Sequence, residues 1–143
     1  MIVADTSFLF SLYGADAHTA TARAWAMQAN LPITITALNR YEFENAIRFA
    51  AFRKAISQQD ARNSLFAFEA DLKNGLLQSA SPDLTAIVRE AARLSEAHTM
   101  NGGHRSFDIL HVASARLLKA SRFLSFDANQ RKLAGAVKLP VGP

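Results

Sequence analysis

The sequence predicts an α/β fold, with a short parallel β-sheet flanked by helices on both faces of a single domain spanning residues 1–143. Short apolar segments alternate with longer segments of helical periodicity, a pattern typical of buried parallel strands. A length of 143 residues corresponds to one domain. Half of the residues are hydrophobic and none is cysteine. The chain can therefore build a core without disulfides, and any bound metal needs oxygen or imidazole ligands.

Five short strands are expected, each a run of about three residues between helical segments. The first begins almost at the N-terminus, the second follows Pro32, and the third follows the breaker Asn74-Gly75. The predicted strands are residues 2–4, 33–35, 76–78, 123–125 and 137–139.

Three of the intervening helices carry recognisable start or stop signals. Ser57 and Asp60 form a capping-box pattern before an apolar helical face. The segment 81–83, Ser-Pro-Asp, predicts a helix start with Pro82 at the first helical position, and this helix should stop by residues 101–103. A further helix is entered through Ser106.

The overall charge and the N-terminal segment indicate which partners and which cellular location to expect. Sixteen basic against twelve acidic residues leave a formal charge of +4, which favours a polyanionic partner such as nucleic acid only weakly. The apolar N-terminal segment lacks a basic stretch and is interrupted by Asp5, unlike a signal peptide. No run of 18 apolar residues could span a membrane. We therefore expect a cytoplasmic protein that does not bind membranes.

Two aspartates follow predicted strands at equivalent places. Asp5 comes directly after the first strand, and Asp127 follows the strand at 123–125 with one residue between. The ordinary role of such an aspartate is to cap the next helix. Because ligands bind beyond the carboxyl ends of parallel strands, two of them also suggest a shared site.

The helix after Thr36 carries two glutamates with different surroundings. Glu44 has Arg40 four residues before it and Arg48 four after, which predicts a solvated ion-pair ladder. Glu42 has no cation at these spacings. It is therefore predicted to face a partner elsewhere in the fold.

Asp108 lies among apolar residues in the first turn of the helix that begins at Ser106. Pairing with Arg105, three residues before it, is one explanation. Its apolar neighbours also suggest partial burial, and a buried carboxylate needs a partner or a metal ion. His111 shares a helix face with Asp108 and is expected to be a supporting or core histidine rather than a ligand.

Four carboxylates that converge on one sheet edge would repel one another unless cations bind between them. Hard divalent ions such as Mg²⁺ or Mn²⁺ prefer oxygen ligands of this kind. An acidic site in a basic protein suits phosphodiester hydrolysis by a metal-activated water. The predicted metal-binding catalytic set is Asp5, Glu42, Asp108 and Asp127.

The ordered set of motifs resembles the PIN domain family, and most of all the VapC-type toxins of bacterial and archaeal toxin–antitoxin pairs. The motifs lie in the family's order over nearly the whole chain. They are Asp5-Thr6-Ser7, Glu42 in the segment 41–46, Asp108 in the segment 107–113, and Ser125-Phe126-Asp127.

The resemblance implies a Mg²⁺- or Mn²⁺-dependent endoribonuclease that leaves a 5′-phosphate and a 3′-hydroxyl. It implies that the four carboxylates bind the metal, with Ser7 and Ser125 at small-polar positions beside the site. In the family, Thr is more usual at the position of Ser125, so this chain departs from the pattern by a conservative change. It further implies a homodimer and a cognate VapB-type antitoxin, which often blocks the acidic site with an arginine.

Basic residues near the predicted site are candidates for binding the RNA backbone. Arg105 is nearest in sequence to a predicted ligand, and four more basic residues lie on or beside the helix of Glu42. These are Arg40, Arg48, Arg53 and Lys54.

Three other functions can be compared with these residues. One alternative is a binding module, bound to an antitoxin and acting mainly as a co-repressor on operator DNA, although all four acidic positions are filled. A phosphatase of the haloacid dehalogenase type needs a second Asp where this chain has Ser7. A dinucleotide-binding fold needs a Gly-rich turn after the first strand, which is absent.

Overall fold

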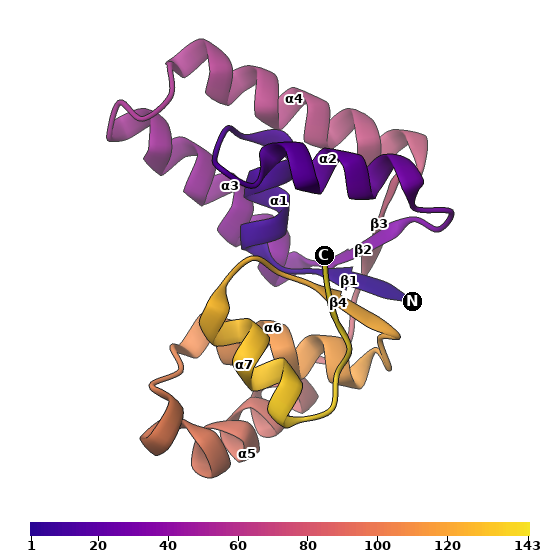
Figure 1. Cartoon of the computed structure of the whole chain (residues 1–143), viewed down its shortest axis with the longest axis vertical. Coiled ribbons are helices and arrows are strands. Elements are labelled where there is room, and N and C mark those ends of the chain that lie inside the picture. The colour runs from indigo at the N-terminus through magenta and orange to yellow at the C-terminus, as the bar shows by residue number, and fades with distance from the viewer.

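A five-stranded parallel sheet lies at the centre of the computed structural model, which describes residues 1–143 (Figure 1). The strands are β1 (Ile2–Ala4), β2 (Ile33–Thr36), β3 (Leu77–Ala80), β4 (Arg122–Leu124) and β5 (Val141–Gly142), in the spatial order β3-β2-β1-β4-β5. The helices are α1 (Thr6–Tyr13), α2 (Thr19–Gln28), α3 (Ala37–Phe52), α4 (Gln58–Asn74), α5 (Leu84–Gly102), α6 (Ser106–Leu117) and α7 (Ala128–Ala136). The predicted α/β fold with a parallel sheet is confirmed.

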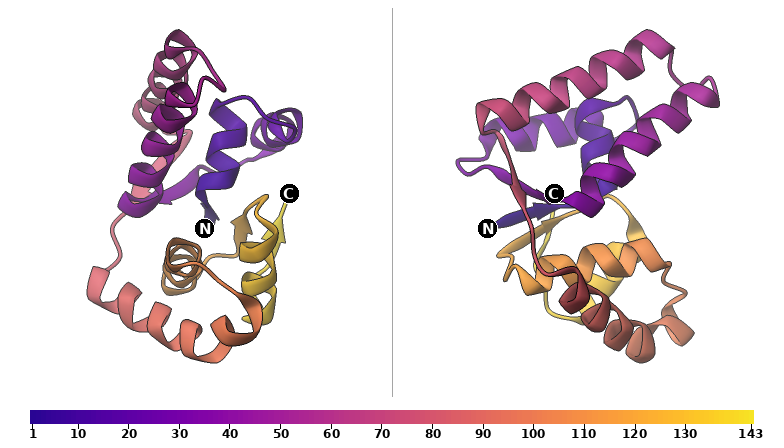
Figure 2. Two further views of the ribbon diagram at one scale, coloured as in Figure 1. Left: turned by 90° about the vertical axis from the view of Figure 1, so that its left-hand side faces the viewer. Right: turned by 180° about the vertical axis from the view of Figure 1, so that it is seen from behind.

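The helices form two layers, with α1 to α4 on one side of the sheet and α5 to α7 on the other (Figure 2). Successive strand residues point to opposite faces, so β1 places Val3 in the core of the second layer and Ala4 in that of the first. In β4, Phe123 and Leu124 divide in the same way. Burial on both faces explains why these strands read as continuous apolar runs. None of the helices combines the length and the apolar character needed to cross a bilayer.

Several helix ends follow the predicted signals. Ser57 and Asp60 form a capping box at the start of α4. Gly103 ends α5 with a left-handed φ of 64°, a conformation that costs glycine little. At the start of α5 the prediction is wrong by two residues. Asp83, not Ser81, caps the helix and accepts a hydrogen bond from Ala86 N at 2.7 Å, and Pro82 lies outside the helix.

Four strands lie within two residues of their predicted bounds, but the fifth prediction is wrong. Residues 137–139 close the C-terminus of α7, where Lys138 N donates to Gly135 O and Leu139 N donates to Ala134 O. Lys138 has a left-handed φ of 58°, which breaks an extended run. Leu139 is apolar because it is buried in the core, and the strand follows it as β5.

The order of the strands places β1 at the topological switch point. β1 pairs with β2 on one side and with β4 on the other, and the chain leaves β1 and β4 at the same edge of the sheet. In open α/β sheets the crevice beyond such a switch point is where ligands bind. The segments that follow β1 and β4, with Asp5 and Asp127, lie there.

Candidate active site

Asp5 is held at the first turn of α1, directly beyond β1. Its carboxylate caps the helix by accepting a hydrogen bond from Phe8 N at 2.8 Å. The hydroxyls of Ser7 and Ser125 also donate to it, each at 2.8 Å. The side chain is fully buried and all three donors are neutral. Burial therefore outweighs the hydrogen bonds and raises the pKa of Asp5 to about 6.

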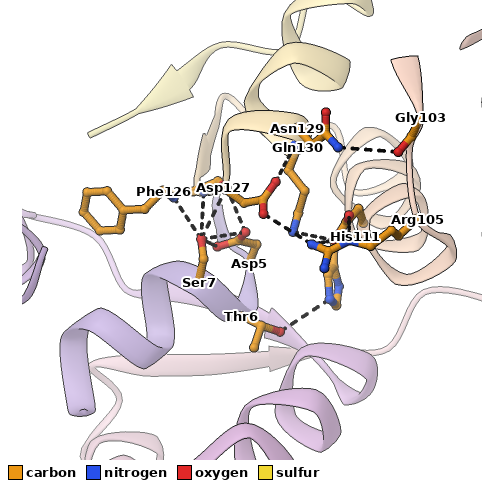
Figure 3. A network of polar contacts seen from close by, with 12 residues as sticks. Asp5, Thr6, Ser7, Gly103, Arg105, His111, Phe126, Asp127, Asn129 and Gln130 are labelled. Atoms are coloured by element: carbon orange, nitrogen blue, oxygen red, sulfur yellow. Dashed lines mark hydrogen bonds and ion pairs between the residues drawn. The ribbon is translucent and has the colours of Figure 1, made fainter. Parts of the chain in front are cut away.

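The two serines also join the segments that follow β1 and β4. Ser7 Oγ accepts hydrogen bonds from Phe126 N at 2.9 Å and Asp127 N at 3.2 Å, and Ser125 Oγ accepts a second bond from Asp127 N at 3.1 Å. Figure 3 shows this network beside Asp5. The hydroxyls thus position Asp127 relative to Asp5, and both serines lie next to the predicted ligands.

Glu42 projects from α3 toward α6, where it finds the partner that its own helix lacks. Its Oε2 lies 2.6 Å from Nε2 of His111, and Thr6 Oγ1 donates to the same oxygen. Partial burial acts to raise the pKa of Glu42, but the hydrogen bonds from His111 and Thr6 outweigh burial and lower it below its usual value.

Asn39 sets the protonation pattern of His111. Its Oδ1 accepts from Thr36 N and Oγ1 in the capping box of α3, so its amide nitrogen is the group 2.9 Å from His111 Nδ1. Because an amide nitrogen only donates, His111 Nδ1 is the acceptor from Asn39. His111 Nε2 therefore carries the hydrogen and donates a hydrogen bond to Glu42. His111 is almost fully buried and contacts both Asn39 and Glu42.

Asp108 and Asp127 share the guanidinium of Arg105. Arg105 Nε donates to Asp108 at 2.8 Å, and Arg105 Nη2 lies 3.4 Å from Asp127. Gln130 Nε2 donates to Asp108 at 3.1 Å, and Asp127 caps α7 by accepting from Gln130 N at 2.8 Å. The predicted pairing of Asp108 with Arg105 and its predicted burial are therefore both present: Asp108 is buried while the Arg105 side chain is 71% exposed.

A cleft of about 480 Å³ opens above these residues. Glu42, Asp108 and Asp127 line it, and Asp5 lies beneath Ser7, which is part of the lining. The fold thus brings all four predicted carboxylates to one edge of the sheet, although they come from four different helix starts or faces.

The donor set matches the chemistry of a hard divalent cation. All four candidate ligands are carboxylates, and Asp5 is a buried carboxylate whose hydrogen-bond donors are all neutral, so a nearby cation would relieve its desolvation. In the arrangement described, no three His, Asp or Glu side chains stand close enough to hold a metal ion. Arg105 supplies the positive charge between Asp108 and Asp127, so metal binding there requires its side chain to move.

Three polar residues of the site were not singled out from the sequence. Thr6 and Asn39 bind the Glu42–His111 pair, and Gln130 binds Asp108. Each has a local signal, because Thr6 lies between Asp5 and Ser7, and Asn39 and Gln130 each stand three residues after a helix N-cap. That spacing marks the capping turn, but it does not reveal the contact across the fold.

The candidate RNA-binding residues separate into two groups. Arg105 and Arg53 line the cleft. Arg40 lies outside the cleft lining and pairs with Glu44 at 2.9 Å and with Glu69. Arg48 also pairs with Glu44, at 3.2 Å, which confirms the predicted ladder around that residue.

The chain belongs to the PIN domain family, whose model matches residues 2–136. Among curated protein sequences, none matches the chain significantly.

Solved structures share the fold at low sequence identity. VapC20 of Mycobacterium tuberculosis, described as a toxin that cleaves the sarcin-ricin loop, matches with a TM-score of 0.70 and 16% identity, covering 92% of this chain and 94% of that chain. VapBC2 of Rickettsia felis, bound to a DNA fragment from its promoter, matches with a TM-score of 0.65 and 14% identity, covering 99% of this chain and 98% of that chain. VapBC-1 of nontypeable Haemophilus influenzae matches with a TM-score of 0.63 and 14% identity, covering 99% of this chain and 97% of that chain.

Proposed function

We propose that this PIN domain is a metal-dependent endoribonuclease, the toxin of a VapBC-type toxin–antitoxin pair. The observation that carries the proposal is the set of four carboxylates at the switch point, one of them buried with neutral donors alone. The similar fold of a toxin described as cleaving the sarcin-ricin loop supports RNA as the substrate class.

In this proposal Asp5, Glu42, Asp108 and Asp127 hold Mg²⁺ or Mn²⁺. A bound ion of this kind activates the attacking water and stabilises the leaving oxygen. The water attacks the phosphorus in line with the leaving 3′-oxygen, so that the products carry a 5′-phosphate and a 3′-hydroxyl.

The surrounding residues prepare the site for this chemistry. Thr6 and His111 orient Glu42 through hydrogen bonds, and Ser7 and Ser125 keep Asp5 and the segment before Asp127 in place. Arg105 is exposed enough to leave the two aspartates and bind a substrate phosphate instead.

Cleavage of RNA by the pure protein tests the proposal. We expect cleavage with Mg²⁺ or Mn²⁺, none with EDTA, and a loss of at least about 100-fold in Asp5→Ala and Asp108→Asn. Glu44→Gln is the matched control, because Glu44 lies on the same helix as Glu42 but in the ion-pair ladder with Arg40 and Arg48. Equal cleavage in all samples would refute the site and indicate a contaminating nuclease.

An antitoxin and a homodimer belong to the same proposal. The similar structures named VapBC support a cognate VapB-type antitoxin as partner. Co-expression with the product of an adjacent short reading frame should yield a stable complex in which cleavage is inhibited, and sedimentation of the free protein should give the mass of a dimer.

A binding role is the second candidate, since one similar structure is bound to promoter DNA. In that case the chain would act with its antitoxin as a co-repressor and have little or no nuclease activity. A gel shift of operator DNA by the complex, together with no metal-dependent cleavage of any RNA, would favour this candidate.

A further inference from the structure

The cleft continues well beyond the carboxylates along one face of α3. Phe49 and Arg53 line its far part, seven and eleven residues after Glu42, and these spacings keep all three residues on one helix face. His18 and Phe126 line the cleft as well, from segments outside α3. Aromatic rings therefore line the cleft together with the predicted metal ligands.

Arg53 is the arginine of the cleft that is free to bind an anion. Its guanidinium carbon lies 4.8 Å from the ring centroid of Phe49, and it makes no ion pair. Arg105, the other arginine of the lining, is paired with Asp108 and Asp127. A phosphate that enters the far part of the cleft therefore meets an uncompensated positive charge.

The aromatic rings offer flat surfaces to a planar ligand. Phe49 is 51% exposed, and its ring stacks on that of Phe52 with a centroid separation of 5.8 Å. His18 is exposed and stacks on Phe126 with a centroid separation of 4.4 Å and an angle of 7° between the rings. Phe126 stacks in turn on the buried Phe8 at 5.9 Å, so the outer histidine is backed by a fixed aromatic column.

We propose that Phe49 and Arg53 form a subsite for an unpaired nucleotide of the RNA substrate. The guanidinium of Arg53 moves off the Phe49 ring to bind the phosphate, and the base stacks on the ring in its place. Aromatic stacking together with an arginine is the combination by which proteins hold single-stranded nucleic acid without reading its sequence. The column of His18 and Phe126 provides a second surface for a neighbouring base. The subsite rests on the proposed nuclease function, because it is the continuation of the same cleft.

The position of the subsite fixes its distance from the cleaved bond. Seven residues of helix separate Glu42 from Phe49 by about 10 Å along the axis. At a stacked rise of about 3.4 Å per nucleotide, this corresponds to roughly three nucleotides. In this proposal the substrate is single-stranded over about three nucleotides on one side of the scissile phosphate.

Binding of short oligoribonucleotides tests the subsite separately from catalysis. Fluorescently labelled single-stranded 8-mers are titrated with Asp108→Asn protein in Mg²⁺, alone and combined with Phe49→Ala, Phe49→Trp or Arg53→Ala. We expect Phe49→Ala to weaken binding about tenfold, and Phe49→Trp to retain it, because each base–aromatic stack contributes on the order of 1–3 kcal/mol. Arg53→Ala should reduce the salt dependence of binding. Phe66→Ala and Arg62→Ala, exposed positions on α4 outside the cleft, are matched controls and should bind as the parent does.

An abasic scan locates the contact. When one base at a time is removed from the oligonucleotide, the parent should lose affinity at one position about three nucleotides from the cut, whereas Phe49→Ala should be insensitive there. In the active background, Phe49→Ala should raise KM and leave kcat within about twofold.

The outcomes separate the two proposals. If the wild-type protein cleaves RNA but Phe49→Ala changes neither affinity nor KM, or changes them no more than Phe66→Ala does, the subsite is refuted and the nuclease stands. If the wild-type protein neither binds nor cleaves any RNA in Mg²⁺ or Mn²⁺, both proposals are refuted.

Discussion

The two sides of the acidic cleft hold buried carboxylates in opposite ways. On the side of β1, Asp5 accepts hydrogen bonds from two hydroxyls and a backbone N–H, with no cation in contact. On the side of α6, Asp108 is also buried but lies against the guanidinium of Arg105. Hydrogen bonds satisfy the oxygen atoms on both sides, yet only the second side also compensates the charge. Asp5 is therefore the carboxylate with most to gain from a bound cation.

The largest expected effect follows from this uncompensated charge. Asp5→Asn should stabilise the metal-free protein by up to about 3 kcal/mol at pH 8, because a rise of roughly two units in pKa corresponds to that free energy. The folded protein holds the Asp5 proton more tightly than the unfolded chain does, so the wild type loses stability as pH rises from about 4 through about 6. The advantage of the variant should therefore shrink toward pH 4.

Denaturant unfolding in EDTA across pH 4–8 measures this effect. Asp108→Asn is the comparison, and we expect it to lose about 1 kcal/mol because it removes a carboxylate from its guanidinium partner, a pair that is largely open to solvent on the arginine side. Destabilisation by Asp5→Asn at pH 8 would show that the two sides of the cleft do not differ in the way described.

The next effect concerns the buried histidine that supports Glu42. His111→Leu should cost about 2 kcal/mol of stability, because it leaves the buried amide of Asn39 without its acceptor and removes one of the two donors to Glu42. Cleavage should fall with it, by at least tenfold, as Glu42 loses its orientation. Thermal unfolding and initial rates measure the two effects. A control substitution at the half-buried His98, His98→Ala, should change neither by much, and an unaltered cleavage rate in His111→Leu would exclude the supporting role.

A smaller effect is expected from the arginine that neutralises the α6 side. Arg105→Ala should raise the affinity for Mn²⁺ about fivefold, since removing one exposed positive charge beside two carboxylates is worth about 1 kcal/mol. Isothermal titration calorimetry measures this affinity without any turnover. Arg40→Ala, which removes an arginine outside the cleft, should leave it unchanged. An equal or weaker affinity in Arg105→Ala would mean that Arg105 does not compete with the cation.

The smallest effect separates the two glutamates of α3. Glu44→Gln should change stability by no more than about 0.5 kcal/mol and leave cleavage unchanged, because its ion pairs with Arg40 and Arg48 involve exposed arginines. Glu42→Gln should nearly abolish cleavage. Parallel measurement of rates and melting temperatures compares the two, and a substantial loss of cleavage in Glu44→Gln would place that residue in the site after all.

Much of the fold and of the candidate site could be predicted locally. Strands β1, β2 and β4 contain residues buried on both faces of the sheet. The capping residues Ser57 and Asp60, three positions apart, mark the start of α4. Glu42 could be distinguished from Glu44 because ion pairs on one helix depend only on spacing. The prediction of a fifth strand at residues 137–139 is wrong because it rests on the apolar Leu139, which makes its contacts across the core and not within a strand.

The sequence by itself determined the α/β class, the carboxylates at the strand ends and the local ion pair of Asp108 with Arg105, because these depend on neighbours a few residues away. Only the tertiary structure decided the partners separated by long stretches of chain. Ser125 binds Asp5 across 120 residues, Asn39 and Glu42 bind His111 across about 70, and Phe49 and Arg53 join the cleft of Asp108. Such contacts depend on how strands and helices pack, and no local spacing specifies that packing.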